Sequence, residues 1–130
     1  GLGVSSISDS WYSFAQNEKN LEDYYEKINS GVIPVTKGHI LTEEDLIIRK
    51  HILNIMCHFE TNWSDDLYFS GIYNVLENLE EMIADELVEV SGQELKVTEK
   101  GKPFVRNICM AFDLRLKRNI PNKQLFSLTI

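Results

Sequence analysis

The sequence predicts a mainly α-helical fold with one small β-hairpin, in an α+β domain. Apolar residues recur at three-to-four spacing in several segments, which is the period of amphipathic helices. One pair of short alternating segments, 87–90 and 93–97, flanks the turn residues Ser91 and Gly92, as expected of a hairpin. With 130 residues, 43% of them hydrophobic, the chain can bury one modest core.

Residues 1–7 have the pattern of a short apolar strand that gives way to a loop of small residues. No other segment of the sequence offers this strand a partner, so we expect a lone strand that belongs to a sheet elsewhere; a frayed terminus is the alternative. Residues 17–29 are predicted to form a helix with Asn17 as its N-cap. Gly31 ends this helix, and residues 31–40 are predicted to be an extended linker.

The clearest predicted element is a helix that runs from Thr42 to about residue 58. Thr42 is its N-cap, and Asp45 three residues later makes the start close to a capping box. The first turn is acidic, which suits the helix dipole. One face carries the apolar stripe that we expect in the core: Ile48, Ile52, Ile55, Met56 and Phe59.

The rest of the chain is predicted to hold a short helix or turn at residues 65–70, a third helix at 71–86, the hairpin and a final helix. The entry to the final helix is marked by Thr98, Gly101 and Pro103. This helix is predicted to end at about residue 118. The tail alternates apolar side chains at Phe126, Leu128 and Ile130. This alternation predicts either a strand added to a neighbour or a segment that fills a groove.

Composition excludes several classes of protein. No apolar run approaches the roughly 20 residues that span a bilayer, and the first residues lack the basic start of a signal peptide. We therefore expect a cytoplasmic protein with no membrane partner. The sequence does not begin with Met, so Gly1 is interpreted as an internal position of a longer protein.

Cysteine and histidine usage predicts no metal site in this chain. Cys57 and Cys109 are too few to hold an iron–sulfur cluster, which usually needs three or four thiolates. Both lie in apolar stretches and are predicted to be reduced core thiols; a disulfide is the alternative. His51 and His58 lie about two helical turns apart, and His39 is distant in sequence, so we expect structural histidines.

The order helix, helix, hairpin, helix resembles a winged helix, a shape that often binds nucleic acid. In that shape the helix at residues 71–86 would enter the major groove, where it needs Lys or Arg to neutralise phosphates. This helix carries five carboxylates and no cation. Residues 60–95 contain ten acidic and no basic residues, whereas residues 96–130 contain eight basic and two acidic ones. The charges therefore exclude nucleic acid as a partner and indicate two faces with different partners.

More specific patterns lie at both ends of the sequence. They are Gly3-Val4-Ser5-Ser6-Ile7-Ser8, Phe14-Ala15-Gln16-Asn17, Tyr24-Tyr25, Gly31, Pro34, Gly38, residues 41–49, Val97-Thr98-Glu99-Lys100-Gly101, residues 106–113 (Arg-Asn-Ile-Cys-Met-Ala-Phe-Asp), Phe126-Ser127 and Ile130. In this order and spacing they resemble the C-terminal domain of oxygen-independent coproporphyrinogen III oxidases, over essentially the whole chain. Phe14 stands where the family usually has Tyr, and Leu128 where it usually has Arg.

The resemblance implies a radical S-adenosylmethionine enzyme of haem biosynthesis. In that family three cysteines in a barrel hold a [4Fe-4S] cluster that cleaves the cofactor. The resulting radical drives oxidative decarboxylation of two propionates, giving protoporphyrinogen IX. The cysteine motif lies far upstream in the family, so this fragment alone is expected to bind no cofactor and to be inactive. Residues 1–16 would be a barrel-closing strand and loop from the missing barrel, and residues 17–130 the winged-helix-like domain.

The resemblance also suggests site residues. Ile7, with Gly3, Val4 and Ser5, occupies the position that lines a second S-adenosylmethionine in the family, and small residues there allow close approach of the backbone. The alternative is that these residues only close the barrel edge. No catalytic residue is expected in this chain. Gln16 and Asn17 are predicted either to hydrogen-bond across the junction with the barrel or, for Asn17, to cap a helix.

The last helix is basic, with Lys102, Arg106, Arg115, Lys117 and Arg118. The substrate implied by the resemblance, a tetrapyrrole, carries four carboxylates. Arg106 and Arg115 are the candidate substrate-binding residues, because a guanidinium binds carboxylates in a bidentate manner. The alternative is a solvated face that pairs with the acidic third helix.

Three functions remain open from the sequence. The first is the domain that covers the barrel of the coproporphyrinogen enzyme, acting as a monomer. The second is the equivalent domain of a related radical S-adenosylmethionine haem chaperone. The third is an acidic winged-helix module that binds another protein.

Overall fold

The computed structural model describes residues 1–66 and 70–118, and it divides the chain into two compact units. The first unit is Gly1–Leu46 and the second is Ile47–Ile130. The division falls within the first half of helix α2 (Glu43–His58). Each unit has its own small antiparallel sheet of three strands, so the chain is an α+β protein, as predicted.

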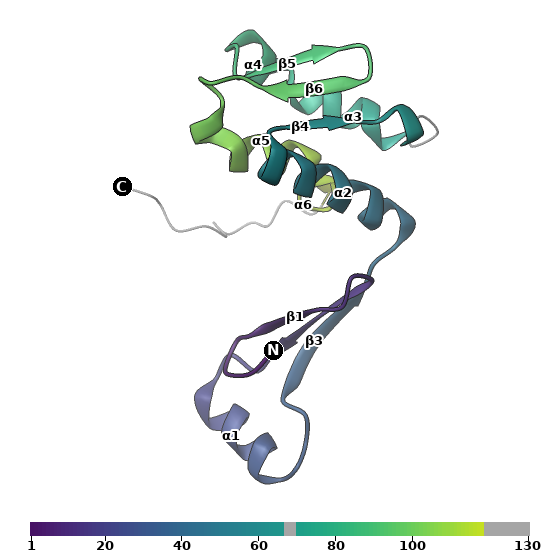
Figure 1. Ribbon diagram of the computed structural model, residues 1–130. Coiled ribbons are helices and arrows are strands. Elements are labelled where there is room, and N and C mark those ends of the chain that lie inside the picture. Colours follow the sequence, from purple (N-terminus) through teal and green to yellow (C-terminus); the bar gives the residue numbers. More distant parts are fainter. Residues whose placement is uncertain (67–69, 119–130) are drawn as a thin grey trace. The chain divides into compact units, whose positions relative to one another are not determined.

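The sheet of the first unit consists of β1 (Ile7–Asp9), β2 (Ser13–Asn17) and β3 (Val35–Ile40), in the order β1-β2-β3 (Figure 1). The lone strand predicted at residues 1–7 is therefore wrong: residues 1–6 are not a strand, and β1 pairs with β2. The turn between these strands lacks Gly and Pro, and Trp11 takes a φ of 68° there. The sequence consequently contains no turn signal at this point.

Helix α1 (Leu21–Asn29) begins four residues later than predicted. Its N-cap is Asn20, whose Oδ1 accepts hydrogen bonds from the backbone N–H groups of Glu22 at 2.7 Å and Asp23 at 3.3 Å. The predicted N-cap, Asn17, is wrong because that residue ends β2. The helix ends as predicted, before Gly31 at a φ of 70°. The predicted division between residues 16 and 17 falls inside β2.

The first unit has no apolar core among its described residues. Only Asn17 and Pro34 are buried there. Its large apolar side chains are exposed at Leu2, Ile7, Trp11, Tyr12, Leu21, Tyr25, Ile28, Val32, Ile33, Val35 and Ile40. Hydrogen bonds therefore hold the unit together, and many of its large apolar side chains are left exposed.

The second unit continues from α2 through a second sheet and further helices (Figure 1). Its elements are β4 (Glu60–Asn62), the 3-10 helix η1 (Ser64–Asp66), α3 (Gly71–Asn78), α4 (Glu80–Ala84), β5 (Val88–Ser91), β6 (Glu94–Val97), the 3-10 helix η2 (Lys102–Phe104), α5 (Val105–Phe112) and α6 (Leu114–Arg118). The strand order is β4-β6-β5. The predicted hairpin is confirmed as β5 and β6, with Gly92 in the turn at a φ of 59°.

The predicted start of α2 is confirmed by a reciprocal capping box. The Thr42 N–H donates to Asp45 Oδ2 at 2.8 Å, and the Asp45 N–H donates back to Thr42 Oγ1 at 3.2 Å. The helix ends at His58, where the periodicity predicted it.

Two long predicted helices are each divided in the structure. The helix predicted at 71–86 breaks at Leu79, which is fully buried between α3 and α4. The final helix breaks at Asp113, whose Oδ1 accepts a hydrogen bond from the Leu116 N–H at 2.9 Å and so caps α6. Strand β4 was not predicted, because Glu60-Thr61-Asn62 is entirely polar. The predicted tail strand and residues 67–69 of the short helix or turn predicted at 65–70 lie outside the described residues, whereas residues 65 and 66 belong to η1.

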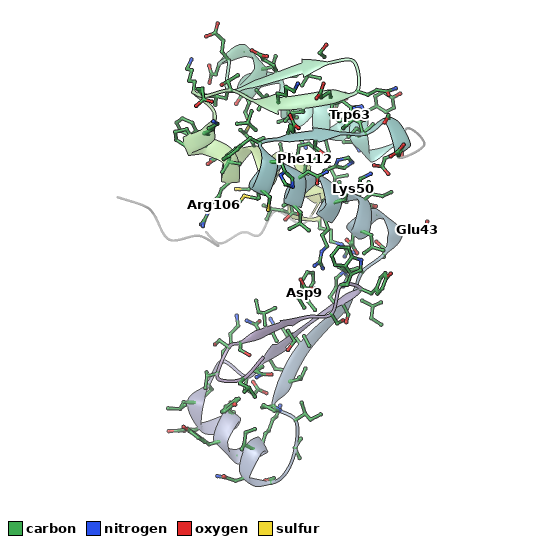
Figure 2. The ribbon with its side chains drawn as sticks, viewed as in Figure 1. Asp9, Glu43, Lys50, Trp63, Arg106 and Phe112 are labelled. Atoms are coloured by element: carbon green, nitrogen blue, oxygen red, sulfur yellow. The ribbon has the colours of Figure 1, made fainter. Side chains whose placement is uncertain are left out.

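The core of the second unit lies between the sheet and helices α2, α3 and α5. Its members are Ile48, Ile55, Trp63, Ile72, Val75, Leu79, Val88, Leu95, Val97, Ile108, Cys109, Ala111, Phe112 and Leu114. Figure 2 labels Trp63 and Phe112 among them. Cys109 is a buried thiol as predicted, but the predictions for Cys57 and Met56 are wrong, since both are exposed on α2. Both cysteines are free, so the alternative of a disulfide is excluded.

None of the helices formed by the described residues combines the length and the apolar character needed to cross a bilayer.

Candidate functional site

The candidate site in the first unit is the N-terminal loop, residues 1–6, which precedes β1. The side chain of Asn17, the last residue of strand β2, binds this loop. Its Nδ2 donates to the carbonyl oxygens of Gly1 at 3.1 Å and Gly3 at 2.9 Å, and lies 3.4 Å from Ser6 Oγ. Asn17 is 5% exposed, so these contacts satisfy a buried amide.

Further hydrogen bonds hold the backbone of the same loop. The Ser5 N–H donates to the Glu18 carbonyl at 2.7 Å, and the Asn17 N–H donates to the Ser6 carbonyl at 3.0 Å. Gln16 Nε2 donates to the Ser5 carbonyl at 3.3 Å. Gln16 and Asn17 were predicted to bond across a junction or, for Asn17, to cap a helix; in the structure both side chains bind the N-terminal loop of their own unit.

The loop is held in an unusual conformation. Gly3 has a φ of 105° and Ser5 a φ of 60°, both in the left-handed region that favours glycine. A Cβ atom placed on Gly3 would meet nothing within 4 Å, so a ligand can approach its backbone closely. Ser5 is exposed and Ile7 is 63% exposed at the start of β1. The four residues predicted to line a cofactor, Gly3, Val4, Ser5 and Ile7, thus belong to one hydrogen-bonded segment, in which Ser5 and Ile7 are exposed and Gly3 and Val4 are half-buried.

The predicted substrate-binding residues lie in the second unit. Arg106 is on α5 and Arg115 on α6, and both are exposed. Figure 2 shows Arg106 directed away from the core. No ion pair joins Arg106 to another residue that the structure describes, so it does not pair with the described acidic residues of α3 and α4.

A buried polar network in the second unit was not found from the sequence. His51 on α2 is fully buried, and its Nδ1 lies 2.8 Å from Thr61 Oγ1. Asn54 Nδ2 donates to the same hydroxyl at 3.3 Å. His51 Nε2 lies 3.3 Å from Asp66 Oδ2, within ion-pair distance but without hydrogen-bond geometry. Lys50 Nζ donates to that carboxylate oxygen at 2.8 Å.

The environment of His51 favours its neutral form. Burial lowers the pKa of its imidazole most, the Asp66 carboxylate opposes this, and the Lys50 ammonium lowers the pKa further. With a neutral ring, Thr61 can donate to Nδ1 while Nε2–H faces Asp66. The network therefore joins α2 to β4 and η1, and the interpretation of His51 as structural agrees with these contacts.

A surface hollow of about 230 Å³ lies beside this network. It is lined by Asn54, His58, Glu60, Thr61, Asn62 and Glu94. Despite these side chains, no three His, Cys, Asp or Glu residues in the described part of the chain are grouped so that they could hold a metal ion.

Several known proteins are similar in sequence to this chain. No family model matches the chain. Oxygen-independent coproporphyrinogen III oxidase of Escherichia coli is 34% identical over 130 residues, covering 95% of this chain and 28% of that enzyme. The enzyme of the same name from Synechocystis is 34% identical over 140 residues, covering all of this chain and 30% of the relative. The chain thus spans less than a third of the length of these relatives.

The fold agrees with a solved structure described as coproporphyrinogen III oxidase (HemN) from Escherichia coli, a radical SAM enzyme. The superposition has a TM-score of 0.79 at 36% sequence identity, and covers 89% of this chain and 28% of the other. At this identity the likeness extends to sequence as well as to fold.

Proposed function

Since the chain belongs to the oxygen-independent coproporphyrinogen III oxidases, we propose that it covers the active site of such an enzyme, which converts coproporphyrinogen III to protoporphyrinogen IX. The chain corresponds to the C-terminal part of the enzyme. The observation that carries the proposal is the combined match in sequence and fold to the Escherichia coli protein over nearly the whole chain. The enzyme would act in the cytoplasm as a monomer. A haem chaperone is not favoured, because the curated relatives matched here share the oxidase name.

The exposed apolar surface of the first unit supports an intramolecular partner. Leu2, Ile33 and Ile40 are 99%, 77% and 79% exposed, which is costly in water unless another surface covers them. Strand β1 is an edge strand of its sheet, and edge strands can pair with a further strand. We place the missing barrel against this unit, with residues 1–16 closing the barrel.

The second unit supports a winged-helix-like domain. Its order of helix α2, strand β4, helices α3 and α4, and strands β5 and β6, with the sheet order β4-β6-β5, is the order expected of that fold. Helix α4 presents Glu80 and Glu81 to solvent, which opposes contact with phosphates. This domain is therefore proposed to contact protein, not nucleic acid.

In the whole enzyme, an iron–sulfur cluster and S-adenosylmethionine bound by the barrel would supply the radical chemistry of the oxidation. The described part of this chain contains no metal-binding group of its own. Its residues would act around that chemistry: the segment from Gly3 to Ile7 would contact a second S-adenosylmethionine, because Gly3 leaves room for close approach of the backbone. The chain as a whole would exclude water from the site.

Arg106 and Arg115 would attract the propionate carboxylates of the tetrapyrrole. Both are exposed, and a guanidinium binds a carboxylate through two parallel hydrogen bonds. In the whole enzyme, Arg106→Ala is expected to raise the KM for coproporphyrinogen III about tenfold with kcat little changed. An unchanged KM would remove Arg106 from the substrate site.

The experiment that tests the proposed function is an anaerobic assay of the whole protein with S-adenosylmethionine, a reductant and coproporphyrinogen III. We expect protoporphyrinogen IX to form with the whole protein and not with residues 1–130 alone. Stable haem binding without turnover would indicate a chaperone. Capture of another protein without turnover would indicate an interaction module.

A further inference from the structure

We infer that Asn17 is a positioning residue, which fixes the N-terminal loop (residues 1–6) in the conformation that receives the second S-adenosylmethionine. The inference rests on the proposed function, because it assumes that this loop contacts that cofactor. It assigns a role to a residue that touches the loop and not the ligand.

The chemistry of the contact favours Asn over other side chains of similar size. The Asn17 amide nitrogen faces three oxygen atoms, two of them backbone carbonyls, which can only accept. A carboxylate in the same place would face these carbonyls without a proton to donate. Because the side chain is 5% exposed, water cannot readily replace the lost donors.

The loop depends on these polar contacts because apolar packing does not hold it. Leu2 is 99% exposed, and the first unit has no buried apolar cluster. Two residues of the loop, Gly3 and Ser5, are in left-handed conformations, and for Ser5 this conformation has an intrinsic energetic cost. Polar contacts therefore set where the loop backbone lies. Asn17 supplies most of them, Glu18 accepts from the Ser5 N–H, and Tyr24 on α1 accepts from the Gly3 N–H at 3.2 Å.

The groups of the loop that Asn17 binds differ from the groups that we expect to contact the cofactor. Asn17 binds the carbonyls of Gly1 and Gly3, whereas the Cβ direction of Gly3 is open and Ile7 is 63% exposed. Because Asn17 is only 5% exposed, a ligand that approaches Gly3 or the exposed Ile7 is not expected to touch the Asn17 side chain. The effect of Asn17 on that ligand would pass through the loop backbone.

The test compares Asn17→Asp with Asn20→Asp in the whole protein. Both changes add one negative charge to the same unit, but Asp is as good an N-cap as Asn, so Asn20→Asp preserves the start of α1. Asn20→Ala is a second control, which weakens the start of α1, and with it the bond from the Gly3 N–H to Tyr24 Oη at 3.2 Å, but leaves the Asn17 side chain in place. Two quantities are measured: hydrogen exchange of the amides of residues 2–8 without ligand, and S-adenosylmethionine bound per cluster by equilibrium dialysis.

We expect Asn17→Asp to speed exchange in the loop and to weaken binding of the second equivalent of S-adenosylmethionine about tenfold or more, with the first equivalent unchanged. Asn20→Asp should not weaken that binding, and Asn20→Ala should weaken it much less than Asn17→Asp does, because it removes none of the Asn17 contacts. Wild-type binding by Asn17→Asp would overturn the inference, as would an equal loss in Asn20→Ala, because the effect would then come from general destabilisation of the unit.

A further variant, Ile7→Glu, distinguishes failure of this inference from failure of the proposed cofactor contact. If Ile7→Glu weakens binding of the second equivalent but Asn17→Asp does not, the contact stands and the positioning role is wrong. If both variants bind two equivalents as the wild type does, the loop does not contact the cofactor, and the proposed cofactor contact fails together with this inference.

Discussion

Gly101 packs directly against the carbonyl group of Leu87, so closely that a Cβ atom on Gly101 would lie 1.9 Å from the Leu87 oxygen. The contact joins the segment that follows β6 to the residue that precedes β5. Thr98 reinforces it, because its Oγ1 donates to the Glu86 carbonyl at 2.8 Å and accepts from the Gly101 N–H at 3.0 Å. Glycine is required at 101 for space, not for its backbone angles, since its φ is −80°.

Gly101→Ala is expected to destabilise the second unit by about 2 kcal/mol, because the backbone of Leu87 must move to accommodate the methyl group. The matched control is Gly92→Asn. Gly92 has a φ of 59° that Asn tolerates, and a Cβ there meets nothing within 4 Å, so this change should cost well under about 1 kcal/mol. Urea denaturation followed by tryptophan fluorescence measures both, because Trp63 is buried whereas Trp11 is already 60% exposed in the folded chain. Equal losses in the two variants would contradict the packing argument.

The stability of the second unit is expected to fall as the pH drops below about 6.5. Burial lowers the pKa of His51 in the folded chain, so the unfolded chain binds a proton first. The contribution of His51 to the free energy of unfolding is therefore complete above the pKa that His51 has in the unfolded chain. It is lost as the pH falls toward the pKa of His51 in the folded chain, by at most about 1.4 kcal/mol per pH unit.

His51→Gln, which keeps hydrogen-bonding groups but does not titrate, is the comparison for this pH dependence. The difference in unfolding free energy between wild type and variant should shrink from pH 7.5 to 5.5. His39 and His58 are present in both proteins, so their contributions cancel to first order. A difference that grows on acidification would show that the folded state stabilises the imidazolium.

The two thiols are expected to differ sharply in reactivity. Burial raises the pKa of Cys109 to about 11, and its Sγ contacts the Ile52 carbonyl at 3.8 Å, whereas Cys57 is exposed on α2. Iodoacetamide at pH 8 should alkylate Cys57 in the folded chain and spare Cys109, as peptide-resolved mass spectrometry can measure. In urea both should react. Comparable labelling of Cys109 in the folded chain would show that α5 does not pack as described.

Local signals in the sequence were sufficient to predict α2 and the hairpin. Thr42 and Asp45 define the helix start within four residues, and Gly92 defines the turn between two adjacent strands. The sheet of the first unit could not be predicted in this way. Strand β3 pairs with β2 across the intervening helix α1, and periodicity carries no information on such distant pairing.

The candidate site was predictable only in part. Resemblance to a family indicated Gly3 and Ile7, but no local pattern indicated that Asn17 holds the loop. Asn17 and Asn20 are both reasonable N-caps by sequence, and the structure shows that Asn20 takes that role. Asn17 is thereby free to bind residues fourteen and sixteen positions earlier, a contact that depends on the fold of the whole unit.

We propose that the rest of a longer enzyme covers the exposed apolar surface of the first unit. Amide hydrogen exchange of residues 1–130 alone, compared with the same residues in the whole protein, measures this directly. We predict that β1, β2, β3 and α1 exchange at least about tenfold more slowly in the whole protein, while the core of the second unit exchanges alike in both. Equal exchange of the first unit in the two proteins would contradict the claim.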